Sequence, residues 1–272
     1  MAQPGAQPLA EDVQRLNAQA LVRPGDPVVR ARLALALDAA ASTEAGDALQ
    51  QAMGLTRTCL ELGIVEPASE AAEILFKQFR GRAGIGTEVA LLMADATLQR
   101  DGGKDVDAAR KLLEAVVAEH PDAVGARLRV AALALGLGEA EAARRWIEPV
   151  ASSTTQTRTL FVQTLLALDA VDEAVSEARA GVEASGESTR EASVLYQLMG
   201  IGELSRGDAD AAIAAMSEGV RLAPDDAVAY YNLALAFEAS GSRLAALGVC
   251  DAGLDLAPAD ARLGALKVRL AS

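Results

Sequence analysis

Residues 196–224, YQLMGIGELSRGDADAAIAAMSEGVRLAP, and residues 230–258, YYNLALAFEASGSRLAALGVCDAGLDLAP, are two versions of one pattern set 34 residues apart. Tyr196 aligns with Tyr230, and Pro224 closes the first copy as Pro258 closes the second. Further residues fall at equal offsets in the two copies: Gly200 and Ala234, Gly207 and Gly241, Ala212 and Ala246, Gly219 and Gly253. A fixed period of this length predicts stacked helix–turn–helix units rather than a globular catalytic domain.

The residue types in this pattern have a packing role. Small residues such as Gly200 and Ala212 let the two helices of a hairpin approach to about 8–10 Å, and Tyr230 and Leu233 fill the remaining space. Pro258 ends its hairpin, because proline cannot continue a helix interior.

The pattern resembles the tetratricopeptide-repeat (TPR) family, whose unit is 34 residues long. The last repeat supplies the residues that the family prefers: Tyr230, Leu233, Ala234, Phe237, Gly241, Ala246, Gly253 and Pro258. The repeat before it has Glu203 where an aromatic residue is expected. The resemblance covers residues 193–258 and implies an all-α fold, a right-handed superhelical solenoid of antiparallel helix hairpins of the bacterial TPR type.

The period continues, with less regularity, towards the N-terminus. It predicts five hairpins within residues 87–258. Residues 11–86 are predicted to be divergent helical repeats, with helices over residues 11–22, 27–41, 44–62 and 67–80. Residues 1–10 are expected to be a flexible tail. Residues 259–272 are expected to form a capping helix that buries Leu263, Leu266 and Leu270.

Composition agrees with a helical fold and limits the partners. Hydrophobic residues make up 51% of the 272 residues and aromatic residues only 3%, with Ala and Leu, the best helix formers, dominant. The net charge of −13 repels phosphate backbones and anionic lipids, so nucleic acid and membranes are not expected as partners. Residues 1–10 lack the features of a signal peptide, and no run of 18 apolar residues predicts membrane insertion, so a cytoplasmic location is expected.

Residues with catalytic or metal-binding chemistry are sparse. His120 is the only histidine, which leaves no His-dependent triad or two-histidine metal site within one chain. Cys59 and Cys250 stand 191 residues apart, without metal-ligand spacing, and Cys250 occupies a buried apolar position of the repeat. We therefore expect no enzyme activity, no catalytic residues, no cofactor and no metal.

The resemblance also implies a binding groove, because the first helix of each hairpin lines the concave face of TPR proteins. The predicted peptide-binding positions are Arg129, Gln163, Gln197, Leu198, Ile201, Val228, Tyr231, Asn232, Leu235 and Glu238, and Val194 shares this face. Asn232 and Gln197 are expected to hold a peptide backbone beside an apolar lining. Alternatively, Leu198 and Ile201 pack against the neighbouring repeat, since a one-residue shift in register rotates each side chain by about 100°.

Two functions follow from this interpretation. The first is a protein–protein interaction scaffold or adaptor that binds a peptide or helical segment of another protein in its concave groove. The alternative is a structural self-assembly module, in which the groove receives the chain's own N-terminal helix, residues 11–22, or another copy in a homo-oligomer.

Overall fold

The computed structural model describes residues 6–100, 105–185 and 190–272. These residues form fifteen α-helices and a few residues of 3-10 helix, and no strand occurs among them. The chain divides into two compact units, Met1–Val130 and Ala131–Ser272. The boundary falls inside helix α7, Val124–Gly136.

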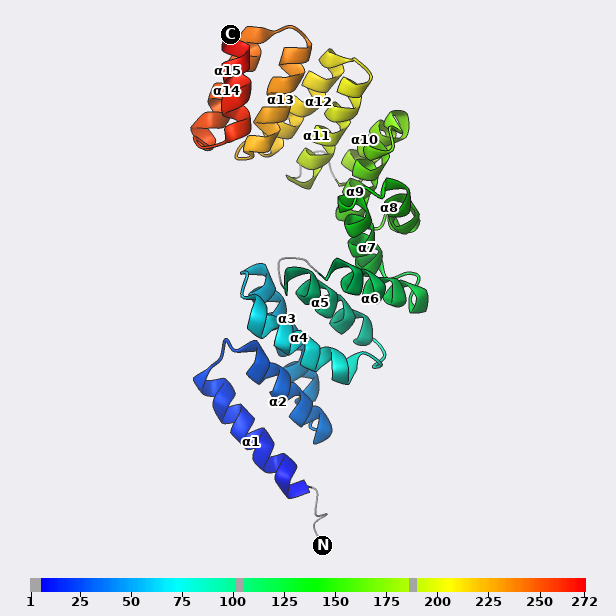
Figure 1. Cartoon of the computed structure of the whole chain (residues 1–272), viewed down its shortest axis with the longest axis vertical. Helices are drawn as coiled ribbons and strands as arrows, with labels where there is room; N and C mark the ends of the chain where they lie inside the picture. The colour runs from blue at the N-terminus through cyan, green and yellow to red at the C-terminus, as the bar shows by residue number, and fades with distance from the viewer. Residues whose placement is uncertain (1–5, 101–104, 186–189) are drawn as a thin grey trace. The chain divides into compact units, whose positions relative to one another are not determined.

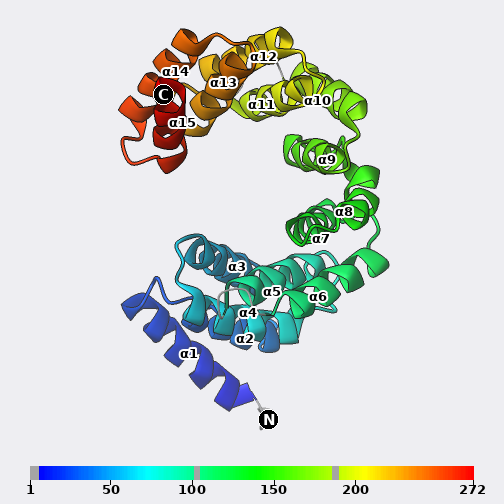
Figure 2. The same ribbon diagram turned by 45° about the horizontal axis from the view of Figure 1, so that its top comes forward.

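The first unit is built from α1 to α6 and the start of α7 (Figures 1 and 2). Its complete helices are α1 Ala6–Val22, α2 Pro27–Ala39, α3 Ala45–Glu61, α4 Val65–Phe79, α5 Gly86–Gln99 and α6 Val106–Glu119. Met53, Leu75, Phe79 and Val89 form the centre of a core that joins α2 to α5. Helix α1 packs on α2 through a separate small cluster that contains Leu16.

The second unit repeats one hairpin arrangement. Its helices are α8 Ala140–Ile147, α9 Thr155–Ala167, α10 Val171–Ser185, α11 Arg190–Ser205, α12 Ala209–Leu222, α13 Ala227–Ala239, α14 Arg243–Leu256 and α15 Ala261–Ala271. The 3-10 helix, Glu148–Val150, follows α8 directly. Helices α11 to α14 lie side by side (Figure 1), and each contacts the next.

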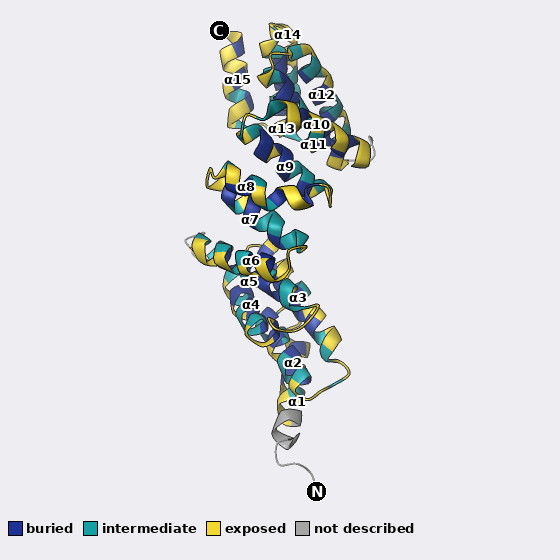
Figure 3. Ribbon diagram, turned by 90° about the vertical axis from the view of Figure 1, so that its right-hand side faces the viewer, coloured by how far each residue is buried: buried dark blue, intermediate teal, exposed yellow. Residues whose placement is uncertain are grey.

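The structure confirms the helical solenoid and the predicted order of helices. Five hairpins occupy the expected range, from the α5–α6 pair to the α13–α14 pair. Helix α15 buries Leu263, Leu266 and Leu270, and its other residues are largely exposed (Figure 3), as expected of a terminal helix. Residues 6–10 of the predicted tail belong to α1, and residues 1–5 lie outside the described part of the chain. The proposed division at residue 86 stays a prediction.

Aspartates fix the starts of several helices. The carboxylate of Asp26 accepts hydrogen bonds from the backbone N–H groups of Val28 and Val29 at 3.0 and 3.2 Å, at the start of α2. Asp226 and Asp260 cap α13 and α15 in the same way. Each cap satisfies N–H groups that have no partner within the helix, so it marks where the helix begins.

Many helices end in one recurring turn, in which a residue with positive φ allows the chain to reverse. In the α13–α14 turn this is Gly241 (φ 76°), and the N–H of Ser242 donates to the carbonyl of Phe237 at 2.9 Å. This bond is the signature of a Schellman motif. The matching positive-φ residues in other turns are Ala41 (49°), Gly63 (73°), Gly138 (78°), Asp169 (58°) and Gly207 (81°).

The turn between α2 and α3 gives a direct stability prediction. Ala41 has φ 49°, a conformation that costs a residue with a Cβ about 1–2 kcal/mol. We expect Ala41→Gly to raise the free energy of unfolding by about 0.5–1 kcal/mol, after the larger unfolded-state entropy of glycine is subtracted. Urea denaturation followed by circular dichroism measures the change.

The neighbouring residue supplies the control for this turn. Ala40 has φ −80° and is exposed, so Ala40→Gly gains nothing in the folded state and should lower stability by up to about 1 kcal/mol. If both substitutions destabilise the protein equally, Ala41 is not strained.

Glu203, which replaces an aromatic residue of the repeat pattern, has its own ion-pair network. Its side chain is 10% exposed and its carboxylate pairs with the guanidinium of Arg206 at 3.1 Å. Arg206 also donates from Nε to Asp172 of α10 at 3.0 Å. The network therefore joins α10 to α11, where an aromatic side chain would otherwise pack.

Candidate protein-binding surface

The first helices of the last two complete hairpins, α11 and α13, carry most of the predicted binding residues. They contact each other directly, and small residues bring each one close to its second helix. A Cβ placed on Gly219 of α12 would lie 2.3 Å from Nε2 of Gln197, and one on Gly200 would lie 2.5 Å from Cγ of Met216. This close approach sets the orientation of the α11 side chains.

Gln197 and Asn232 bond to each other rather than standing free. The side chain of Gln197 is directed between the helices of its hairpin, where Nε2 donates to the carbonyl of Met216 at 3.1 Å. Its Oε1 accepts a hydrogen bond from Nδ2 of Asn232 at 3.2 Å. Gln197 is 7% exposed, whereas Asn232 is half-buried. Gln197 is thus engaged in the fold, and Asn232 stands nearer the surface.

The α15 side of α13 holds three further predicted residues. Tyr231 and Leu235 pack partly against the cluster formed by α14 and α15. The guanidinium of Arg262 lies 5.5 Å from the centre of the Tyr231 ring, within the range of a cation–π contact. A hydrogen bond to Asp260 raises the pKa of the Arg262 guanidinium by stabilising its charged form. Glu238 accepts from Nη2 of Arg269 at 2.6 Å.

The remaining predicted residues divide by exposure. Leu198 is only 8% exposed, so it belongs mainly to the packing between helices. Arg129, in the first unit, forms a two-pronged ion pair with Asp95, with both N–O distances at 2.7 Å. Gln163 of α9 is exposed.

Three apolar residues remain at the surface of α11 and α13. Val194 is 44% exposed, Ile201 36% and Val228 42%. Val194 and Val228 are 34 residues apart and occupy the same repeat position, whereas Ile201 lies seven residues, about two turns, after Val194. We call these three residues the apolar strip. Repetition of an exposed apolar side chain at one repeat position provides a surface that the fold itself does not bury.

The sequence contains a signal for two of the hydrogen-bonded pairs described above, namely their spacing. Asp95 precedes Arg129 by 34 residues, and Gln197 precedes Asn232 by 35, so each pair joins equivalent regions of neighbouring repeats. The 34-residue period therefore indicates which positions lie in neighbouring repeats. It does not reveal which of their side chains are directed towards each other.

Two other features are absent from the part of the chain that the structure describes. No group of three or more His, Cys, Asp or Glu side chains there is arranged to hold a metal ion. None of the described helices combines the length and the apolar character needed to cross a membrane.

Comparison with known proteins places this geometry among repeat proteins. Residues 103–160 match the family model described as tetratricopeptide repeat. This segment runs from the approach to α6 through the α7–α8 hairpin and into α9. No curated protein sequence matches the chain.

Several solved structures share the fold at low sequence identity. A tetratricopeptide repeat protein from Parabacteroides merdae is 14% identical, with a TM-score of 0.64, and the match covers 82% of this chain and 85% of that one. YrrB, described as a TPR protein with an unusual peptide-binding site, is 16% identical over 74% of this chain and 99% of its own, with a TM-score of 0.52. Yeast Tom70 is 12% identical over 98% of this chain and 58% of its own, with a TM-score of 0.57. The repeat model thus matches residues 103–160, and the fold of the chain is that of tetratricopeptide-repeat solenoids.

Proposed function

We propose that this protein is a non-catalytic interaction scaffold that binds a peptide or helical segment of a partner protein along α11 and α13. The observation that carries the proposal is the repeated exposure of Val194 and Val228, at 44% and 42%. Burying apolar side chains of this size against a ligand contributes about 25 cal/mol for each Å² removed from water. The peptide-binding site described for YrrB, a protein of similar fold, supports a peptide as the ligand class.

The proposed site has a polar edge beside its apolar part. Asn232 is half-buried, and its Oδ1 and second amide hydrogen remain available after the bond to Gln197. Such an amide can pair with the backbone of an extended segment, and Gln197 holds it in position. The ring of Tyr231, which contacts the guanidinium of Arg262, adds an aromatic surface next to Asn232.

One form of the self-assembly alternative, in which the chain's own helix α1 fills the groove, has less support. Helix α1 buries Leu16 and Ala20 in a cluster with Val29, Leu33 and Leu37 of α2. Its apolar face is therefore already covered and would have to leave α2 before it could fill another groove. Association with a second copy of the chain remains the alternative to the scaffold function. Cys59 and Cys250 are free thiols, as is usual in a reducing compartment, and the proposal keeps the cytoplasm as the location.

The test is to select ligands from a random peptide-display library on the full-length chain and to measure their affinity by fluorescence anisotropy. We expect Val228→Glu, alone or with Val194→Glu, to weaken binding at least tenfold, which corresponds to about 1.4 kcal/mol. The physical reason is that a carboxylate cannot be desolvated beneath an apolar ligand without a large cost.

Ala214→Glu is the matched control, since Ala214 is an exposed position on α12, the second helix of its hairpin. It adds the same charge and should leave the affinity unchanged. Equal affinities for the folded Val228→Glu variant and the wild type would contradict the site. An oligomer in light scattering that Val228→Glu dissociates would favour the self-assembly alternative.

A further inference from the structure

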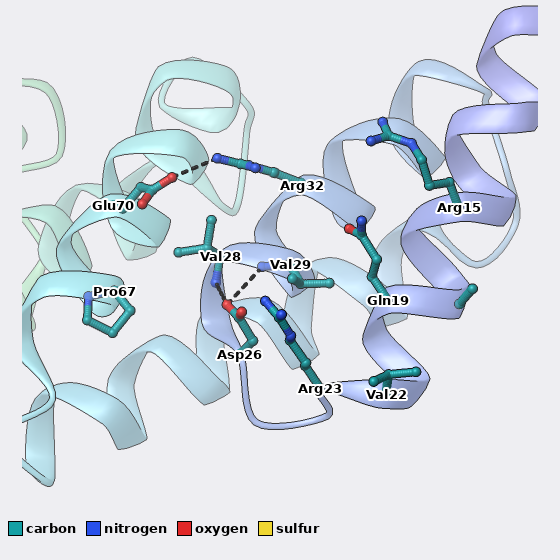
Figure 4. A pocket seen from close by; sticks show the side chains of 11 residues that line it. Arg15, Gln19, Val22, Arg23, Asp26, Val28, Val29, Arg32, Pro67 and Glu70 are labelled. Atoms are coloured by element: carbon teal, nitrogen blue, oxygen red, sulfur yellow. Dashed lines mark hydrogen bonds and ion pairs between the residues drawn. The ribbon is translucent and has the colours of Figure 1, made fainter.

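A second candidate site lies in the first unit, away from the residues that the repeat pattern singles out. A cleft of about 790 Å³ opens where α1 ends, α2 begins and α4 begins (Figure 4). Arg15 and Gln19 reach it from α1, Arg23 from the turn after α1, and Arg32 from α2. Three guanidinium groups therefore line one cleft in a chain whose net charge is −13.

The acidic groups near this cleft are already engaged. Glu70 pairs with Arg32 at 2.7 Å, and one oxygen of Asp26 accepts the two N–H groups at the start of α2 (Figure 4). Asp12 pairs with Arg15 at 2.7 Å. In contrast, the ion pairs formed within the described residues do not include Arg23. Its guanidinium offers two parallel N–H groups, the arrangement that binds a carboxylate in a bidentate manner.

The cleft also has an apolar part and an elongated shape. Val22 is 80% exposed and lines the cleft together with Val28 and Pro67. A second cavity of about 420 Å³ shares Arg15, Gln19 and Arg32 with the first and continues along α1 and α2. The two cavities together form an elongated depression, which suits an extended chain better than a compact ligand.

We propose that this cleft binds an acidic peptide segment of a partner protein, with an Asp or Glu side chain on Arg23 and an adjacent apolar side chain on Val22 and Pro67. The carboxylate is assigned to an internal residue because the depression continues past Arg15 and Arg32, so the peptide chain can extend beyond the anchored residue. This inference goes beyond the scaffold function, since it adds a separate site with different ligand chemistry.

Nucleic acid fits the cleft less well. Neither cavity has an aromatic side chain among its described lining residues, so bases would find no stacking surface. The carboxylates of Glu70 and Asp26 at the cleft, and the net charge of −13, oppose a polyanion. A single carboxylate on an otherwise neutral segment avoids most of this repulsion.

Two pools of fluorescent, C-terminally amidated ten-residue peptides would test the proposal, one with Glu and one with Gln fixed at a central position and the other positions random and uncharged. We expect the full-length chain to bind the Glu pool at least tenfold more tightly in low salt. Arg23→Gln should remove most of this preference. Arg57→Gln, an exposed site on α3 that lines neither cavity, is the matched control and should preserve it.

Several results would overturn the proposal. They are equal binding of the two pools, an unchanged preference in Arg23→Gln, binding that requires a free peptide C-terminus, and tighter Arg23-dependent binding of a single-stranded oligonucleotide than of the Glu pool. Val228→Glu separates this site from the apolar strip, because it should weaken the display-selected ligands and leave the preference for the Glu pool intact.

Discussion

Replacing Gly200 by alanine is expected to lower the free energy of unfolding by roughly 1–3 kcal/mol, although alanine is the better helix former. A Cβ at this position would lie 2.5 Å from Cγ of Met216 and 3.2 Å from the carbonyl oxygen of Ala212. Met216 is completely buried, so it has no solvent-filled space into which to move. Helices α11 and α12 must therefore separate, and urea denaturation followed by circular dichroism will measure the cost.

The same substitution at Gly248 provides the control. Gly248 lies in the middle of α14 and is exposed, and a Cβ placed on it would meet no atom within 4 Å outside its own helix. Gly248→Ala should therefore raise stability by about 1 kcal/mol, the difference in helix propensity. Opposite signs at the two positions are the expected result. Stabilisation at both would contradict the close approach of α11 and α12.

The order of helices was predictable because the signals for it are local and recur along the chain. Proline and glycine occupy the turns, alanine and leucine fill the helices, and small residues recur at the crossings. The start of α1 was less predictable. The helix begins at Ala6 and includes Pro8 in its first turn, where proline is tolerated because the missing N–H has no partner within the helix.

The contacts of the candidate binding residues were harder to predict, because periodicity assigns a side chain to a face of a helix without giving its partner. Gln197 was expected to meet a ligand, yet its polar atoms bond to Met216 and Asn232. Arg129 was expected to contact a peptide, yet its guanidinium forms two hydrogen bonds to the carboxylate of Asp95, each at 2.7 Å. These partners come from the neighbouring helix or the neighbouring repeat, so they depend on helix packing that a single repeat does not determine.

The cleft in the first unit shows a second limit of the sequence pattern. Its lining comes from α1, α2 and α4, and the charged residues Arg15 and Glu70 are far apart in the chain. No 34-residue offset relates them, because the cleft arises from the way in which α4 packs beside α2. The negative net charge of the whole chain also gives no indication of this local cluster of arginines.

Each unit contains one cysteine, so thiol labelling can follow the opening of each unit separately. Cys59 lies in the first unit and Cys250 in the second, and both are buried. Burial raises the pKa of each thiol, and nearby carboxylates add to the effect, Asp26 for Cys59 and Asp251 for Cys250. Both thiols should therefore react slowly with a thiol reagent until the surrounding helices open.

Leu263→Ala is expected to lower the free energy of unfolding by about 2–4 kcal/mol and to speed the labelling of Cys250 at least tenfold. Leu263 is completely buried and shares a cluster with Cys250, Leu266 and Leu270. Its Cδ1 lies 2.8 Å from the position that a Cβ on Gly253 would take, so it fills the space between α14 and α15. Truncation leaves a cavity at this contact, and the terminal helix opens more often. Urea denaturation and thiol labelling measure the two effects.

Val268 on the same helix is the matched control, because it is 72% exposed. Val268→Ala removes apolar atoms that the fold does not bury, and stability should change by no more than about 0.5 kcal/mol. Labelling of Cys59 should be unaffected in both variants, since that thiol belongs to the other unit. If Leu263→Ala accelerates the labelling of both cysteines equally, the two units unfold together and α15 is not a local cap. If it accelerates neither, the packing of α15 on α14 does not protect Cys250.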